Sequence, residues 1–243
     1  MKPRSIYGVL DTNSDITAQR APVTWLASYP RSGNTLLRVI LSCCFNQFTQ
    51  SIYEDNEFAD PIVKRWVGHQ AVGNDPVAFV EEAKRNNRTL YVKTHEAPRS
   101  DWHPTIYVVR DGRSAVVSHT HFLREILGID AEIRDVIAGK FGLAWGDHVK
   151  AWTCRPRSSM LVVRFEDLTV ADPATLRAIS SFIGRDLVRE FDVSFDALHS
   201  RSPLFFRRGS NEANIAELSS ADLELFDTLH GGTLREMGYK DAS

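Results

Sequence analysis

The sequence is poor in cysteine and carries no excess of positive charge. Its 243 residues contain only Cys43, Cys44 and Cys154, and 29 Lys and Arg residues stand against 31 Asp and Glu, a net charge of −2. An odd number of cysteines, two of them adjacent in an apolar stretch, indicates reduced, buried thiols rather than a disulfide-stapled scaffold. Without a global positive field the protein is not expected to bind nucleic acid, so any anion must be held by local cations and backbone amides.

Long hydrophobic runs are missing as well. No stretch of about 18 apolar residues could span a bilayer, and residues 1–21 lack the apolar centre of a signal peptide. No compact group of His, Cys and Asp suggests a metal site. With 43% hydrophobic and 25% charged residues, the composition predicts a globular cytoplasmic protein without a membrane span or a bound metal.

Short apolar runs alternate with segments of helical periodicity from residue 22 onward. The predicted strands are residues 23–28, 90–95, 105–110 and 160–165. The predicted helices are residues 34–48, 113–127, 131–152, 173–183 and 219–236. This order predicts one α/β domain, residues 22–243, with a central parallel sheet flanked by helices. Residues 1–21 are expected to form an irregular arm, and residues 53–88 an insertion over the ligand site, which in such folds lies at the carboxyl ends of the strands.

A turn containing arginine and glycine joins the first predicted strand to the first predicted helix. Residues 28–36 read Ser-Tyr-Pro-Arg-Ser-Gly-Asn-Thr-Leu. Gly33 lets the backbone approach a ligand, and the first amides of the helix are unpaired donors at the positive end of its dipole. Arg31 adds a charge, so the segment predicts a P-loop-like anion site. The alternative is a loop whose Ser and Asn only cap the helix, and the Gly-Lys-Ser/Thr ending of a Walker A loop is absent.

Two polar side chains end the second predicted strand. Lys93 and His95 are two positions apart, so both face the same side of the sheet. A histidine accepts a proton efficiently near neutral pH, and a fixed cation favours a transition state that gains negative charge. A histidine near a strand end is more often structural when it stands alone, but the preceding anion site reverses that expectation.

These segments, in this order, resemble the cytosolic-type sulfotransferases. Residues 29–36 are similar to the family's 5′-phosphosulfate loop, Tyr-Pro-Lys-Ser-Gly-Thr-Thr-Trp, with Arg31 in place of Lys and Leu36 in place of Trp. Residues 93–95 match its Lys-Thr-His. Arg110 at a strand end and Ser118, about two helical turns later, resemble its 3′-phosphate segment.

The resemblance implies transfer of a sulfuryl group from 3′-phosphoadenosine 5′-phosphosulfate (PAPS) to a hydroxyl or amine of a small-molecule, lipid or saccharide acceptor, leaving 3′-phosphoadenosine 5′-phosphate (PAP). It implies His95 as general base, with Lys93 and Arg31 at the reacting sulfate and no metal. The cofactor contacts that it implies are Arg31, Ser32, Gly33, Asn34, Thr35, Leu36, Arg110, Ser118, Phe165, Phe195, Arg207, Arg208 and Gly209.

Some positions depart from the family pattern. Phe165 replaces a Tyr that meets the cofactor base, and Phe195 is the aromatic face left for adenine once Leu36 replaces Trp. His148 is expected to pack and hydrogen-bond rather than to catalyse. The stretch after Gly209 differs from the usual cofactor loop, and the family's dimer segment is not recognisable, so a monomer and a homodimer both stay open.

Two other functions stay open on the sequence alone. A P-loop nucleotide kinase would need the missing Gly-Lys-Ser/Thr loop and a magnesium-holding acid. A nucleotide-binding module without turnover would not need Lys93 and His95, which are both present. The acceptor cannot be named, because its pocket is expected to come from the weakly patterned residues 53–88 and 119–150.

Overall fold

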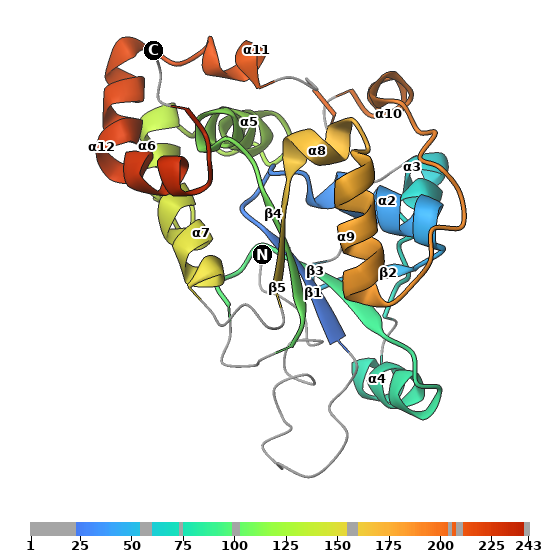
Figure 1. The fold of residues 1–243 in the computed structure, drawn as a ribbon. Helices are drawn as coiled ribbons and strands as arrows, with labels where there is room; N and C mark the ends of the chain where they lie inside the picture. Colours follow the sequence, from blue (N-terminus) through green and yellow to red (C-terminus); the bar gives the residue numbers. More distant parts are fainter. Residues whose placement is uncertain are drawn as a thin grey trace.

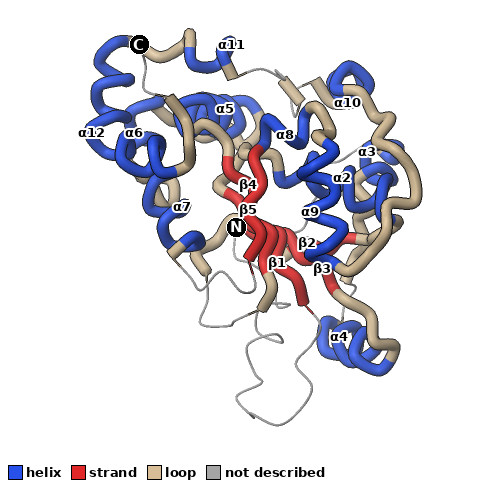
Figure 2. The backbone as a smooth tube through the Cα atoms, viewed as in Figure 1, coloured by secondary structure: helices blue, strands red, loops and turns tan. Residues whose placement is uncertain are grey.

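A five-stranded parallel sheet forms the centre of the molecule. The computed structural model describes residues 23–53, 60–72, 75–98, 103–154, 160–203, 206–207 and 211–240. Its strands are β1 (Val23–Ser28), β2 (Thr49–Ser51), β3 (Leu90–Thr94), β4 (Thr105–Val109) and β5 (Met160–Arg164), in the spatial order β2-β3-β1-β4-β5. Every neighbouring pair is parallel, and Figure 2 shows the strands gathered at the centre with helices around them. The expected α/β fold is therefore confirmed, while the N-terminal arm, residues 1–21, lies outside the described residues.

Helices cover both faces of this sheet. They are α2 (Asn34–Phe45), α3 (Pro61–Trp66), α4 (Pro76–Arg85), α5 (Gly112–Glu125), α6 (Ile133–Ile137), α7 (Trp145–Thr153), α8 (Phe165–Thr169), α9 (Pro173–Ile183), α10 (Phe195–Arg201), α11 (Glu212–Ile215) and α12 (Ser220–Glu236). In the part of the chain that is described, no helix is long and apolar enough to cross a bilayer.

Side chains at alternate positions of the central strands pack into two separate hydrophobic cores. Trp25 of β1 and Tyr107 of β4 pack in one buried cluster with side chains of α5, α6, α7 and α12. Leu26 and Ile106, each one position away, pack in a second cluster with α2, α3, α8 and α9. Successive side chains of a strand point to opposite faces, so a fully buried strand such as β1 needs both layers. Figure 1 shows these two groups of helices on opposite sides of the sheet.

Several helices and strands differ from those predicted from the sequence. The helix expected over residues 131–152 is two helices, α6 and α7, because Gly139 and Gly142 between them take positive φ angles of 79° and 135°. The first helix ends at Phe45 rather than residue 48, since Asn46 adopts the left-handed conformation. The polar strand β2 and the short helices α3, α4, α8, α10 and α11 were not predicted.

Two helices begin within one residue of their predicted starts, 113 and 219, whereas one cysteine was misplaced. Asp111 accepts a hydrogen bond from the Arg113 amide and begins α5, and Ser219 forms a capping box that begins α12. Cys43 and Cys44 are buried as expected, but Cys154, which ends α7, is exposed. Sequence pattern alone does not say which side of a helix end faces water.

Candidate functional site

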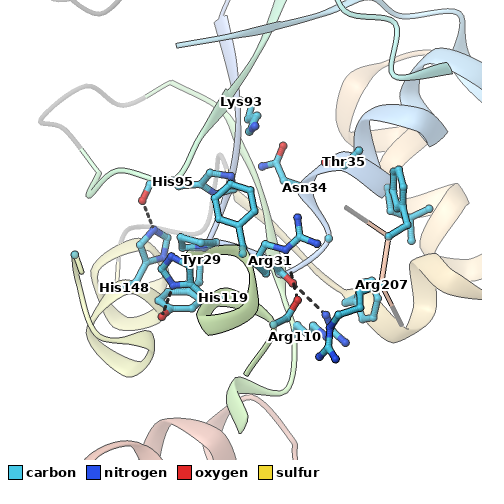
Figure 3. Close-up of a pocket in the computed structure, with 18 of the residues that line it drawn as sticks. Tyr29, Arg31, Asn34, Thr35, Lys93, His95, Arg110, His119, His148 and Arg207 are labelled. Atoms are coloured by element: carbon cyan, nitrogen blue, oxygen red, sulfur yellow. Dashed lines mark hydrogen bonds between the residues drawn. The ribbon is translucent and has the colours of Figure 1, made fainter. Parts of the chain in front are cut away.

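A cavity of about 540 Å³ opens at the carboxyl ends of the three central strands. Twelve of the residues predicted for the site line it: Arg31, Gly33, Asn34, Thr35, Leu36, Lys93, His95, Arg110, Ser118, Phe165, Phe195 and Arg207. Ser32 lies in the same loop with its side chain buried, and Arg208 and Gly209 lie outside the described residues. Figure 3 shows how Lys93, His95, Arg31 and Arg110 surround one space. Parallel strands bring their carboxyl ends to one edge of the sheet, which is why segments far apart in sequence meet there.

The loop between β1 and α2 lines this cavity immediately before the N-terminus of the helix. A turn closes it, with the Ser32 amide 3.2 Å from the Tyr29 carbonyl oxygen, and Arg31 and Gly33 take positive φ angles of 63° and 103°. Gly33 occupies the N-cap of α2 without a side-chain capping bond. Asn34 instead donates backward to the Leu26 carbonyl at 2.7 Å. The alternative in which Ser and Asn merely cap the helix is therefore wrong.

Glycine at position 33 is required by its surroundings as well as by its backbone. A Cβ atom there would stand 2.6 Å from Cδ2 of Phe165, well inside van der Waals contact. The ring of Phe165 thus packs directly against the loop. The buried hydroxyl of Ser32 has no hydrogen-bond partner within the described chain, so the loop holds an unused donor beside its amides.

His95 has a defined orientation. Its Nδ1 atom lies 2.8 Å from the Ser28 carbonyl oxygen and 3.3 Å from the Ser28 hydroxyl oxygen. A carbonyl oxygen only accepts, so Nδ1 must carry the proton, and in the neutral ring the lone pair is then on Nε2. The end of β1 therefore sets the tautomer of a histidine that follows β3.

Two other histidines at the cavity are buried in the neutral form. His148 donates from Nε2 to the His95 carbonyl oxygen at 3.0 Å, and its Nδ1 accepts from the Tyr107 hydroxyl at 2.9 Å. Burial lowers the pKa of His148 from 6.5 to about 4. Burial, with the nearby charge of Arg31, lowers the pKa of His119 to about 4 as well. These contacts give His148 the packing and hydrogen-bonding role that the sequence predicted.

Arg110 is a buried cation with one open donor. Its Nε donates to Asn211 Oδ1 at 2.8 Å and its Nη1 to the Arg31 carbonyl oxygen at 3.1 Å. Its guanidinium carbon lies 4.3 Å from the centroid of the Phe165 ring. The third nitrogen, Nη2, is buried and has no hydrogen-bond partner within the described chain. Burial lowers the pKa of Arg110 to about 10, which still leaves it charged at neutral pH.

Arg31 and Arg207 approach from two other directions. Arg31 Nε lies 3.4 Å from the Ser118 hydroxyl oxygen, and its guanidinium carbon is 5.3 Å from the Phe122 ring centroid. Arg207 donates to Asn214 Oδ1 at 2.6 Å and to Glu217 Oε1 at 3.1 Å. Three guanidinium groups therefore line one cavity, and such a concentration of cations favours a polyanionic ligand.

No group of three or more metal-binding side chains occurs among the residues that the structure describes. Chemically, the cavity combines a helix N-terminus and several cations with an oriented imidazole. That set of groups can hold a phosphate-bearing ligand while a proton is removed from a second one.

A family model of the sulfotransferase domain matches residues 21–229. The chain belongs to this family. A WSCD family member from Drosophila pseudoobscura pseudoobscura is 31% identical over 196 residues, which is 74% of this chain and 56% of that protein. Flavonol 3-sulfotransferase from Flaveria bidentis is 23% identical over 180 residues, 66% of this chain and 56% of that protein. The chain thus spans little more than half the length of these relatives.

Solved structures share the fold of this sulfotransferase domain. A mouse sulfotransferase complexed with PAP gives a TM-score of 0.66 at 20% identity, covering 95% of this chain and 89% of that one. Retinol dehydratase in a complex with retinol and PAP gives 0.60 at 17% identity, covering 92% and 84%. The resemblance predicted from the sequence is confirmed at the level of family and fold.

Several residues at the cavity, or bonded to its arginines, were not singled out from the sequence, although Tyr53 and Phe122 fall in the ranges 53–88 and 119–150 that were expected to form the acceptor pocket. Tyr53 lines the cavity beside His95, Phe122 lies under Arg31, and Asn211 and Asn214 hold two of the arginines. The two asparagines fall in the stretch that departs from the family pattern. Their only signal in the sequence was that departure, because nothing local indicates which distant arginine they meet.

Proposed function

We propose that this protein transfers a sulfuryl group from PAPS to a hydroxyl or amine of a small-molecule, lipid or saccharide acceptor and releases PAP. The observation that carries the proposal is the presence, in one cavity, of Lys93, three arginines, an uncapped helix N-terminus and an oriented His95. Membership of the sulfotransferase domain family supports it, as does the PAP held by two proteins of the same fold.

The residues at the cavity fit a nucleotide that carries phosphate groups on both the 5′ and the 3′ positions of its ribose. Two buried donors, Ser32 Oγ and Arg110 Nη2, have no partner within the described chain, as expected of groups that await an acceptor. The α2 amides and Ser32 would hold the 5′-phosphosulfate, while Arg110, Ser118 and Arg207 would hold the 3′-phosphate. Phe165 and Phe195 offer ring faces for adenine. Arg208 and Gly209 remain predictions for the same contact.

His95 serves as the general base in this proposal. PAPS supplies the sulfur that the acceptor attacks and the phosphate that leaves. The acceptor's proton moves to Nε2, because the Ser28 carbonyl keeps the other proton on Nδ1. The same hydrogen bond stabilises the imidazolium that results, in the way that an orienting acceptor does for other catalytic histidines.

The cations act on the charge that develops at the leaving phosphate. Lys93 and Arg31 both line the cavity. Fixed positive charges that are already in place favour the transition state without reorganisation. In-line transfer through a loose transition state depends mainly on such positioning and charge, so no further chemical group is needed from the protein.

A screen with labelled PAPS tests the proposal. Phenols, aliphatic alcohols, amines, saccharides and lipids are offered as acceptors, and both PAP release and the labelled product are measured. We expect turnover on at least one class, reduced about 100-fold or more by His95→Ala, with PAP affinity nearly unchanged. Phosphate transfer that depends on ATP and magnesium would instead favour a kinase, and tight PAP binding without turnover on any class would favour a silent binding module.

A further inference from the structure

Tyr53 stands at the end of the edge strand β2 and faces the proposed catalytic residues. Its amide donates to the Ser51 hydroxyl at 3.1 Å, and the preceding amide, of Ile52, donates to the Lys93 carbonyl at 3.3 Å. The Ile52 bond continues the contact with β3 one residue beyond β2, and the Tyr53 bond is a local turn that follows it. The side chain of Tyr53 is thereby brought into the cavity, although it belongs to none of the motifs recognised in the sequence.

The ring of Tyr53 lies against two functional side chains at once. It stacks on the imidazole of His95 with a centroid separation of 5.8 Å and an interplanar angle of 22°. The ammonium nitrogen of Lys93 is 5.5 Å from the centroid of the same ring, within the range of a cation–π contact. The ring therefore restricts both groups without donating a hydrogen bond to either side chain.

The hydroxyl of Tyr53 fixes the main chain at the same point. It accepts from the His95 amide at 3.0 Å and donates to Glu96 Oε1 at 3.0 Å. His95 is the first residue after β3, where the hydrogen bonds of the sheet no longer determine the backbone position. The phenol thus supplies a main-chain contact that the sheet does not.

We propose that Tyr53 is a positioning residue for His95, an inference that rests on the proposed function. The hydrogen bond from Nδ1 to the Ser28 carbonyl fixes one atom of the imidazole but lets the ring plane swing about it. The Tyr53 ring closes one face of the imidazole and holds that plane, and its hydroxyl holds the backbone from which the side chain projects. Nε2 then keeps one direction toward the acceptor, as efficient proton transfer requires.

Two substitutions separate the ring from the hydroxyl. Tyr53→Phe keeps the stacking face and loses the hydroxyl, whereas Tyr53→Leu loses both. The control is Phe48→Leu, which removes an exposed ring away from the cavity. Turnover is measured with labelled PAPS and para-nitrophenol, or the best acceptor from the screen, in the full chain. Thermal unfolding and PAP affinity are measured in parallel.

We expect Tyr53→Leu to lower kcat by about 10- to 100-fold, the scale of a small misplacement of a catalytic group. Tyr53→Phe should retain at least about a third of the activity, and PAP affinity and the acceptor KM should stay within about twofold. In a His95→Ala background, Tyr53→Leu should change kcat by less than about twofold, because a residue that acts through His95 has nothing left to position.

A second measurement does not depend on turnover. In histidine-labelled protein, nitrogen NMR reports the tautomer of His95, identified by the signal that disappears in His95→Ala. The Nδ1-protonated tautomer should dominate in all three chains, because the Ser28 carbonyl sets it, whereas the His95 nitrogen signals should broaden only in Tyr53→Leu, where the ring plane is no longer held. Sharp His95 signals and full activity in Tyr53→Leu would overturn the positioning role alone. A native chain that neither binds PAP nor uses PAPS would overturn the proposed function itself.

Discussion

The buried guanidinium of Arg110 provides the most direct test of the nucleotide site. Arg110→Met keeps an unbranched side chain over the Phe165 ring but removes the charge and the open donor Nη2. We expect this variant to bind PAP more weakly and AMP with nearly the native affinity, since AMP lacks the 3′-phosphate. The pair of nucleotides is the matched control, because both carry the same base and a 5′-phosphate.

The size of the effect follows from one charge-assisted hydrogen bond. Such a bond contributes about 1.5–3 kcal/mol, which is about a 10- to 150-fold loss of PAP affinity. At a PAP concentration of 100 times the native Kd, the ligand stabilises the native protein by about 2.7 kcal/mol. The same concentration should stabilise Arg110→Met by only about 0.3–1.4 kcal/mol. The assay is run near pH 7.5, well below the Arg110 pKa of about 10, so that the native side chain is charged.

Calorimetric titration gives the two affinities, and thermal unfolding gives the stabilisation independently. An Arg110→Met variant that binds PAP as tightly as the native chain would refute the assignment of Arg110 to the 3′-phosphate. Equal loss of PAP and AMP binding would also refute it, because Arg110 would then act on a feature that both nucleotides share. Either conclusion requires that Arg110→Met without nucleotide unfolds at a temperature close to that of the native chain.

Three further predictions concern charge, pH and packing. Arg31→Lys should retain most of the turnover and Arg31→Ala should lose it, because the loop needs the positive charge of the side chain rather than the planar shape of the guanidinium. Steady-state kcat of the two variants tests this prediction. An equal loss in both would indicate a bidentate role for Arg31. The pKa of His148 is about 4 in the folded protein and 6.5 in the unfolded chain, so between pH 6.5 and about pH 4 the unfolded chain binds one more proton and the stability of the fold decreases as the pH falls. His148→Gln should reduce this dependence of the unfolding free energy by roughly 1.4 kcal/mol per pH unit in unfolding experiments. An unchanged slope would contradict the prediction. Gly112→Ala should destabilise the fold by about 1–3 kcal/mol in chemical denaturation, because the new Cβ would lie 2.6 Å from Phe226 and also against Trp145. The control is Gly232→Ala, whose Cβ would meet no atom within 4 Å. This control should be neutral or slightly stabilising.

Local pattern determined most of the fold and the proposed ligand-binding loop. All four apolar runs became strands: β1, β3 and β4 are buried along their whole length, as short apolar segments of a parallel sheet are, whereas β5 at the edge of the sheet is only partly buried. The helix 173–183 was predicted with its observed bounds, since Pro173 at its start and Gly184 beyond its end are both local signals. The spacing of Lys93 and His95 was enough to place both side chains at the cavity.

Only the tertiary structure decided which partners these residues meet. The tautomer of His95 depends on a carbonyl 67 positions away in sequence, and Arg110 is held by Asn211, 101 positions away. Tyr53 was missed because β2 is three polar residues long and forms only where β3 offers an edge. Periodicity and capping act within a few residues, whereas the orientation of a catalytic side chain is set by groups that meet only after the sheet has assembled.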